Sequence, residues 1–140
     1  LVFGDDGRIR LLGLGTKRAA TADQMSLEQS RYAAPEIGLG TGSSAATDVY
    51  ALAVTLVEAM SGEVPNVGET VAATLANRVD RLLPVSADFG AVAAPVERAG
   101  RPAPEERGSA LEFGQALAAA ATKLPAPQPI ETVAARKFAD

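Results

Sequence analysis

The fold is decided by residues 47–62, which read TDVYALAVTLVEAMSG. Apolar side chains recur there at the three- and four-residue spacing of a helix, at Val49, Leu52, Ala53, Leu56, Val57 and Met60. The opposite side is almost as apolar, and such a helix must be enclosed by protein or lipid. Because a bilayer span needs roughly 20 residues, we expect a buried central helix. Thr47 is its expected N-cap, and Gly62 its left-handed terminating residue.

The composition of the chain limits the fold class and the kinds of function that are possible. With 140 residues, 47% hydrophobic and only 4% aromatic, the chain predicts one mainly helical domain with a modest core. A net charge of −4 without a basic run argues against a nucleic-acid surface. The absence of Cys and His excludes disulfides, thiolate metal sites and an imidazole base. Neither a signal peptide nor a transmembrane segment is visible, and the start at Leu1 without Met suggests a fragment of a longer protein.

The first twelve residues predict a β-hairpin. An apolar start, the turn Gly4-Asp5-Asp6-Gly7 and an alternating run are typical of two paired strands. The alternation predicts that Arg8 and Arg10 face solvent while Ile9 and Leu11 face the core. Two neighbouring carboxylates without a third ligand are interpreted as turn residues rather than as a metal site.

The remaining elements follow from periodicity and capping signals. Residues 16–31 are polar and predict a long loop. An apolar stripe predicts an amphipathic helix over residues 69–82, and a further helix over 86–100 is expected to break near Pro95. The capping box from Ser109 to Glu112 predicts a last helix that ends near residue 122.

Four motifs, in this order, resemble the C-terminal lobe of eukaryotic-like Ser/Thr protein kinases. The hairpin with Gly13-Leu14-Gly15 is similar to the strands that lead into the Asp-Phe-Gly motif, and Ala34-Pro35-Glu36 resembles the Ala-Pro-Glu that ends the activation segment. Residues 48–53 resemble the start of the buried central helix, and residues 104–109 resemble the Pro-x-x-Arg-Pro-Ser before the last helix. The resemblance covers residues 1–122 and implies a kinase-like lobe. A Pro-rich linker and tail follow at 123–140.

Departures from the kinase pattern imply that the lobe is not an enzyme. Gly13 occupies the position of the Asp that binds magnesium, and glycine has no side-chain oxygen to offer. Gln29 replaces the Thr that supports the catalytic loop, and that loop and the ATP-binding lobe would both precede Leu1. A pseudokinase without cofactor or metal is therefore expected. Two alternatives stay open: an active Ser/Thr kinase with its ATP-binding parts upstream, and a helical interaction domain without kinase ancestry.

The resemblance also assigns structural roles to individual residues. It implies a buried ion pair between Glu36 and Arg107 that fixes the activation segment. Asp48 at the start of the central helix either favours the helix dipole or, as in kinases, accepts hydrogen bonds from the catalytic-loop backbone. The glycine-rich run from Gly38 to Ser43 follows no strand and contains no Lys, so it is interpreted as a connection rather than a phosphate-binding loop.

Within the kinase-like proteins, the Ala-rich composition and Pro-rich tail most resemble the intracellular pseudokinase domains of actinobacterial MviN (MurJ-like) lipid II flippases. This implies a soluble domain of a larger membrane protein, at the cytoplasmic side of the plasma membrane, that regulates export of peptidoglycan precursors. The implied partners are a Ser/Thr kinase that phosphorylates it and a forkhead-associated (FHA) domain protein that reads the phosphothreonine. A dead kinase of this kind recruits partners but does not signal by itself.

Thr132 is the predicted phosphoacceptor. It follows the three prolines at positions 125, 127 and 129, so a second kinase could reach it. Glu131 before it and apolar residues after it form a context similar to that favoured by actinobacterial Ser/Thr kinases. Thr16, Thr21 and Ser26 are the competing candidates.

Overall fold

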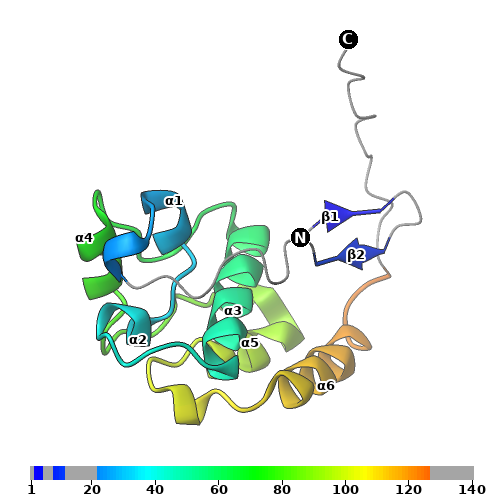
Figure 1. Ribbon diagram of the computed structural model, residues 1–140. Helices are drawn as coiled ribbons and strands as arrows, with labels where there is room; N and C mark the ends of the chain where they lie inside the picture. The colour runs from blue at the N-terminus through cyan, green and yellow to red at the C-terminus, as the bar shows by residue number, and fades with distance from the viewer. Residues whose placement is uncertain (1, 5–7, 12–21, 127–140) are drawn as a thin grey trace.

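The computed structural model describes residues 2–4, 8–11 and 22–126, and this part of the chain is mainly helical, as predicted (Figure 1). Two short strands pair at the start, β1 (Val2–Phe3) and β2 (Ile9–Arg10). The α-helices are α1 (Leu27–Ser30), α2 (Pro35–Gly38), α3 (Ala45–Ser61), α4 (Val71–Ala76), α5 (Ala93–Ala99) and α6 (Ala110–Ala121). The 3-10 helices are η1 (Ala22–Gln24), η2 (Ala87–Val92) and η3 (Pro104–Glu106).

Helix α3 is the central element, and it begins three residues earlier than predicted. Ser44, not Thr47, is its N-cap: Ser44 is extended, and its hydroxyl accepts a hydrogen bond from the Ala46 amide. Thr47 lies at the third helical position, where its hydroxyl accepts a hydrogen bond from the Ser44 amide. The predicted end is confirmed, since Gly62 has a φ of 84° and so occupies the left-handed region that favours glycine.

The hydrophobic core forms around one broad face of α3. Its buried residues are Val49, Tyr50, Ala53, Val54 and Val57. They pack with Ala34, Leu83, Val96, Ala99 and Phe113 from the surrounding elements. Complete enclosure was predicted, but Leu52 and Met60 are each 38% exposed. Apolar residues on every side of a helix therefore did not imply burial on every side here.

Surrounding elements cover α3 on two sides. Figure 1 shows α1, α2 and α4 on one side of it and α5 and α6 on the other. Helix α6 begins as predicted, because Ser109 and Glu112 form a reciprocal capping box. Phe113 is buried and Leu117 partly buried against the core.

The hairpin pairs as expected but does not bury the predicted side chains. Strands β1 and β2 are antiparallel, with Phe3 opposite Ile9. Ile9 and Leu11 are each 59% exposed, so their predicted inward orientation is wrong. A hairpin buries one face only where a second layer covers it, and alternation alone does not show where that layer lies. The predicted turn residues Asp5 and Asp6 lie outside the described residues.

The segment before α2 is more regular than the predicted loop. Residues 22–31 contain η1 and α1, so the loop prediction is wrong over this part. Ser26 caps α1, because its hydroxyl accepts from the Gln29 amide while the Gln29 side chain accepts from the Ser26 amide. Such short capped turns carry little apolar periodicity, which is why the sequence pattern did not reveal them.

Two helices were predicted with the wrong extent. Helix α4 covers only residues 71–76 of the predicted 69–82. The chain leaves the helical path after it, and Asp80 has a φ of 55°. In the predicted helix 86–100 the break lies at Gly90 (φ 57°, ψ −132°), inside η2, rather than at Pro95. Pro95 lies in the first turn of α5, where a missing amide hydrogen breaks no helical bond.

Candidate functional site

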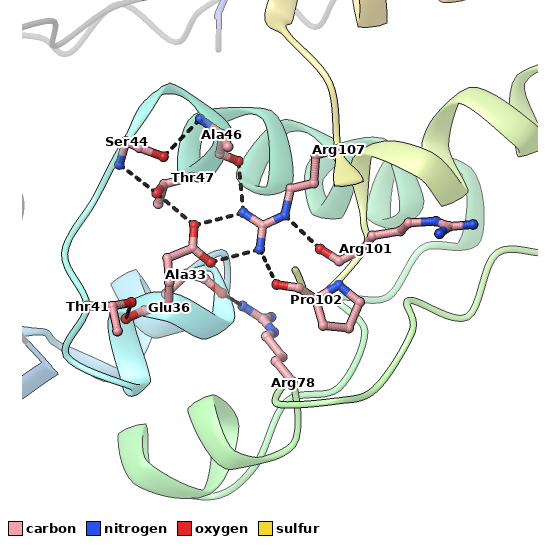
Figure 2. A network of polar contacts seen from close by, with 10 residues as sticks. All are labelled: Ala33, Glu36, Thr41, Ser44, Ala46, Thr47, Arg78, Arg101, Pro102 and Arg107. Atoms are coloured by element: carbon pink, nitrogen blue, oxygen red, sulfur yellow. Dashed lines mark hydrogen bonds and ion pairs between the residues drawn. The ribbon is translucent and has the colours of Figure 1, made fainter. Parts of the chain in front are cut away.

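The most tightly built polar site is the ion pair between Glu36 on α2 and Arg107 after η3 (Figure 2). Arg107 Nη1 lies 2.7 Å from Glu36 Oε1, and Nη2 lies 2.8 Å from Oε2. Their side chains are 0% and 6% exposed. The two parallel bonds form the bidentate arrangement that makes guanidinium–carboxylate pairs both strong and directional. Residues 71 positions apart are thereby fixed to one another.

Arg107 uses every one of its donors. Besides the two bonds to Glu36, Nη1 donates to the Ala46 carbonyl (2.9 Å), Nη2 to Pro102 (2.6 Å) and Nε to Arg101 (2.6 Å). A guanidinium has five N–H groups, so none is left without an acceptor. Arg107 thus ties α2, the first turn of α3 and the segment 101–102 to a single group.

Glu36 is held ionised by its neighbours. Burial by itself would raise the pKa of this carboxyl, but hydrogen bonds from Arg107, from its own backbone and from Thr47 outweigh burial and lower the pKa below its ordinary value. Thr47 Oγ1 donates to Glu36 Oε1 at 2.8 Å. Thr47 therefore serves the ion pair as well as the capping box of α3.

Tyr50 of α3 lies directly against this ion pair. The Arg107 guanidinium carbon is 4.8 Å from the centre of the Tyr50 ring, which is cation–π distance. Tyr50 is fully buried, and this burial is the main reason that its pKa rises to about 12. Its hydroxyl has no hydrogen-bond partner among the described residues.

A second buried arginine, Arg78, holds the segment before α2. Its Nη1 donates to the carbonyls of Ser30 (3.1 Å) and Ala33, and its Nη2 to those of Arg31 and Pro65 (3.2 Å). Arg78 is fully buried, and this burial lowers its pKa. Arg78 therefore binds four neutral carbonyl oxygens through its two terminal nitrogens and, unlike Arg107, is not paired with a carboxylate among the described residues.

Arg78 was not singled out from the sequence. Its signal is a charge on the stripe that contains Leu75 and Leu82, three residues from Leu75. A charged side chain on an apolar stripe indicates a paired buried group, provided that the stripe is a helix. Here the helix ends at Ala76. Arg78 is buried, but it does not lie on a helical stripe.

Tyr32 joins the same segment to α3. Its hydroxyl donates to Glu58 at 2.8 Å, and this bond, with burial, raises the pKa of Tyr32. Gln29, predicted in the place of a catalytic-loop support, uses its side-chain oxygen to cap α1 by accepting from the Ser26 amide (2.9 Å). The Tyr32–Glu58 contact joins residues 26 positions apart and could not be predicted from spacing, whereas the Gln29–Ser26 contact is local.

Asp48 lies exposed on the first turn of α3, at an open hollow of about 520 Å³. Gln29, Tyr32 and Thr47 also line this hollow. A carboxylate in the first turn favours the helix dipole, so the simpler of the two predicted roles for Asp48 suffices here. The run 38–43 connects α2 to α3 rather than a strand to a helix, which agrees with the interpretation as a connection.

Other predicted positions are not part of the described structure. Gly13, Leu14 and Gly15, together with the phosphoacceptor candidates Thr16, Thr21 and Thr132, lie outside the described residues. Ser26 is described, and it is exposed as the N-cap of α1. In ranges 2–4, 8–11 and 22–126, no group of three acidic side chains is arranged to bind a metal ion.

None of the helices within the described ranges combines the length and hydropathy that a bilayer-spanning segment needs. Comparison of the whole sequence with models of known protein families gives no match. Comparison with curated proteins gives no match either.

Proposed function

We propose that residues 1–122 are the C-terminal lobe of a kinase-like domain that has lost catalysis and serves as a phosphorylation-dependent docking module. The observation that carries the proposal is the buried bidentate pair between Glu36 and Arg107 below α3. The resemblance implies this pair from two separate motifs, and the structure brings those two residues together. A helical interaction domain without kinase ancestry would need no such pair at these two positions.

The segment around the pair supports the same proposal. Tyr32 and Arg78 tie the chain before α2 to α3 and to the turn at Pro65. In the proposed lobe this chain is the end of the activation segment, and its rigid attachment would give a partner a fixed surface. Gln29 is occupied in capping α1 and is thus not free to support a catalytic loop.

The proposed docking signal is phosphothreonine at Thr132, and the proposed reader is an FHA domain. A phosphate adds nearly two negative charges and three acceptor oxygens, which Arg and polar side chains of the reader can bind. The prolines before Thr132 favour an extended chain that a kinase and a reader could both approach. By this proposal the domain regulates peptidoglycan precursor export from the cytoplasmic side of the plasma membrane, as part of a larger membrane protein.

Mapping of the phosphorylated residue tests the docking half of the proposal. The chain is incubated with an actinobacterial Ser/Thr kinase and ATP, and the product is digested and analysed by mass spectrometry. Phosphate at Thr132 is expected, with Thr132→Ala removing most of the incorporation and Thr122→Ala, at the exposed end of α6, leaving it unchanged. Incorporation confined to Thr16, Thr21 or Ser26 would overturn the assignment of Thr132.

Phosphotransfer tests the other half. No incorporation into a generic acceptor is expected with ATP and magnesium or manganese, in this chain or any longer protein that contains it. The physical reason is Gly13, which cannot hold the metal that neutralises charge on the transferred phosphoryl group. The variant Gly13→Asp, which supplies a carboxylate at this position, is compared with the parent. An active Ser/Thr kinase is the positive control. Metal-dependent transfer by the parent protein, free of other kinases, would favour the active-kinase alternative.

A further inference from the structure

A groove of about 400 Å³ opens between α2, the turn after α4 and η3. Its apolar lining consists of Pro35, Leu39, Val79, Pro102, Ala103 and Pro104. Leu39 is 60% exposed, so its side chain is available for contact in the groove. The groove lies beside the Glu36–Arg107 pair. Glu36 and Pro102 line the groove, and Arg107 binds both of them, so the pair holds the two walls in place.

Every charged side chain that lines this groove is acidic: Glu36, Asp80, Glu105 and Glu106. Glu36 is balanced by Arg107, and Glu106 by Arg101 at 3.4 Å. Within the described ranges, Asp80 and Glu105 have no cation within ion-pair distance. Both are exposed. Two unbalanced carboxylates beside an apolar surface complement a segment that carries two cations next to an apolar side chain.

We propose that the segment Arg136-Lys137-Phe138 of this chain docks in the groove. Among the thirteen Lys and Arg residues, adjacent cations occur only at Lys17-Arg18 and at Arg136-Lys137. Only the second pair is followed by an aromatic residue, since Ala19 follows the first. Phe138 supplies the apolar side chain for the floor formed by Leu39 and the prolines, and the two cations face Asp80 and Glu105.

The tail is long enough to reach the groove. Helix η3 directly precedes α6, so the groove lies near the start of α6 and the tail leaves from its end. The twelve residues of α6 span about 18 Å. The ten residues from Ala126 to Arg136 extend to about 33 Å. Because the tail is covalently attached, its local concentration is of millimolar order, and modest contacts suffice to hold it.

Docking of the tail has a consequence for regulation, which rests on the proposed function. Thr132 lies four residues before Arg136, so a phosphate on it would come near Asp80 and Glu105. Repulsion between like charges would then weaken the docked state. Phosphorylation would both create the signal for a reader and release the segment that carries it.

Paramagnetic NMR on the full chain tests the docking directly. The chain has no Cys, so Ala139→Cys supplies a single attachment point for a nitroxide label. The amides of Asp80 and Glu105 are expected to broaden much more than those of Met60 and Ser61 at the far end of α3. The double variant with Asp80→Asn and Glu105→Gln should lose this difference, as should high salt. The matched variant with Glu63→Gln and Glu69→Gln, both exposed and outside the groove, should retain it.

The possible outcomes separate the alternatives. Equal broadening of both groups of amides in the parent would overturn the proposal. So would selective broadening that survives the Asp80/Glu105 substitutions, or that arises only between labelled and unlabelled copies. Binding of a free peptide with no effect of the attached tail would assign the groove to another protein. Loss of broadening after phosphorylation of Thr132 would support release, and unchanged broadening would overturn release alone. Failure of an FHA domain to bind would count against the proposed function and leave the docked tail standing.

Discussion

Glu36 and Arg107 are both almost completely removed from water, and each lies within hydrogen-bond distance of its oppositely charged partner. Removing a charge from water is expensive, and only good geometry with additional hydrogen bonds offsets that cost. Here Thr47 donates a further hydrogen bond to the carboxylate, and three carbonyl groups accept the remaining hydrogen bonds of the guanidinium. Loss of either partner should therefore be more harmful than loss of an exposed ion pair.

Arg107→Ala is expected to lower the free energy of unfolding by about 3–5 kcal/mol, because it leaves Glu36 charged and buried without its partner. The matched variant is Arg101→Ala. The Arg101 side chain is 51% exposed and pairs with Glu106, a contact expected to contribute at most about 1 kcal/mol. Denaturant midpoints of the parent and both variants give the comparison. Equal midpoints for the two variants would contradict the buried pair.

Acid should weaken the folded domain through Glu36. Its pKa is lower in the folded chain than the ordinary value of 4.5. The stabilisation is therefore fully present above pH 4.5 and is lost as the pH falls through the lowered folded pKa. The stability difference between the parent and Glu36→Gln should shrink over that range. Glu112 also has a lowered pKa, caused by hydrogen bonds from Ser109, so the Glu36→Gln comparison is needed to isolate Glu36. A constant difference from pH 7 to pH 2 would show that Glu36 does not titrate as described.

Among the elements, those with local chemical signals were predictable from sequence. The box of Ser109 and Glu112 determines the start of α6 through contacts three residues apart, and Gly62 determines the end of α3 through its own backbone. The start of α3 was displaced because Ser44 and Thr47 are both good capping residues, and Ser44 takes the role. Propensity alone does not choose between two caps on neighbouring turns.

Other features depended on contacts that sequence does not reveal. Helix α4 ends early, and the chain after it brings Arg78 to four carbonyls from two distant segments. The exposure of Ile9 and Leu11 depends on what lies over the hairpin, not on their alternation. The ion pair between Glu36 and Arg107 could be predicted only through the family resemblance. Sequence spacing does not predict contacts between residues 71 positions apart.

Two glycines should respond to alanine in opposite directions. Gly62 ends α3 with a φ of 84°, which alanine adopts at a cost of about 1 kcal/mol. Gly114 lies inside α6 with open space around it, so alanine there should add about 0.5–1 kcal/mol through better helix propensity. Thermal or denaturant unfolding of the two variants tests this. Destabilisation of comparable size at both positions would mean that backbone conformation does not distinguish them.

At the scale of the whole molecule, the helices of the described part of the chain pack around α3. The guanidinium groups of the two fully buried arginines bind within the protein: Arg107 binds Glu36 and backbone carbonyls, and Arg78 binds backbone carbonyls. Its open surface hollows include the acidic groove beside η3 and the hollow beside Asp48. The proposed function uses such open surfaces, together with a modified tail, for recruitment of a partner.

The affinity of an FHA domain for the full chain, measured by isothermal titration calorimetry, tests recruitment most directly. After phosphorylation by a Ser/Thr kinase, the chain should bind at least about tenfold more tightly than before, equivalent to roughly 1.4 kcal/mol. Thr132→Ala should remove the gain, whereas Thr122→Ala should preserve it. Equally tight binding by the treated Thr132→Ala chain and the phosphorylated parent would contradict the proposed docking function.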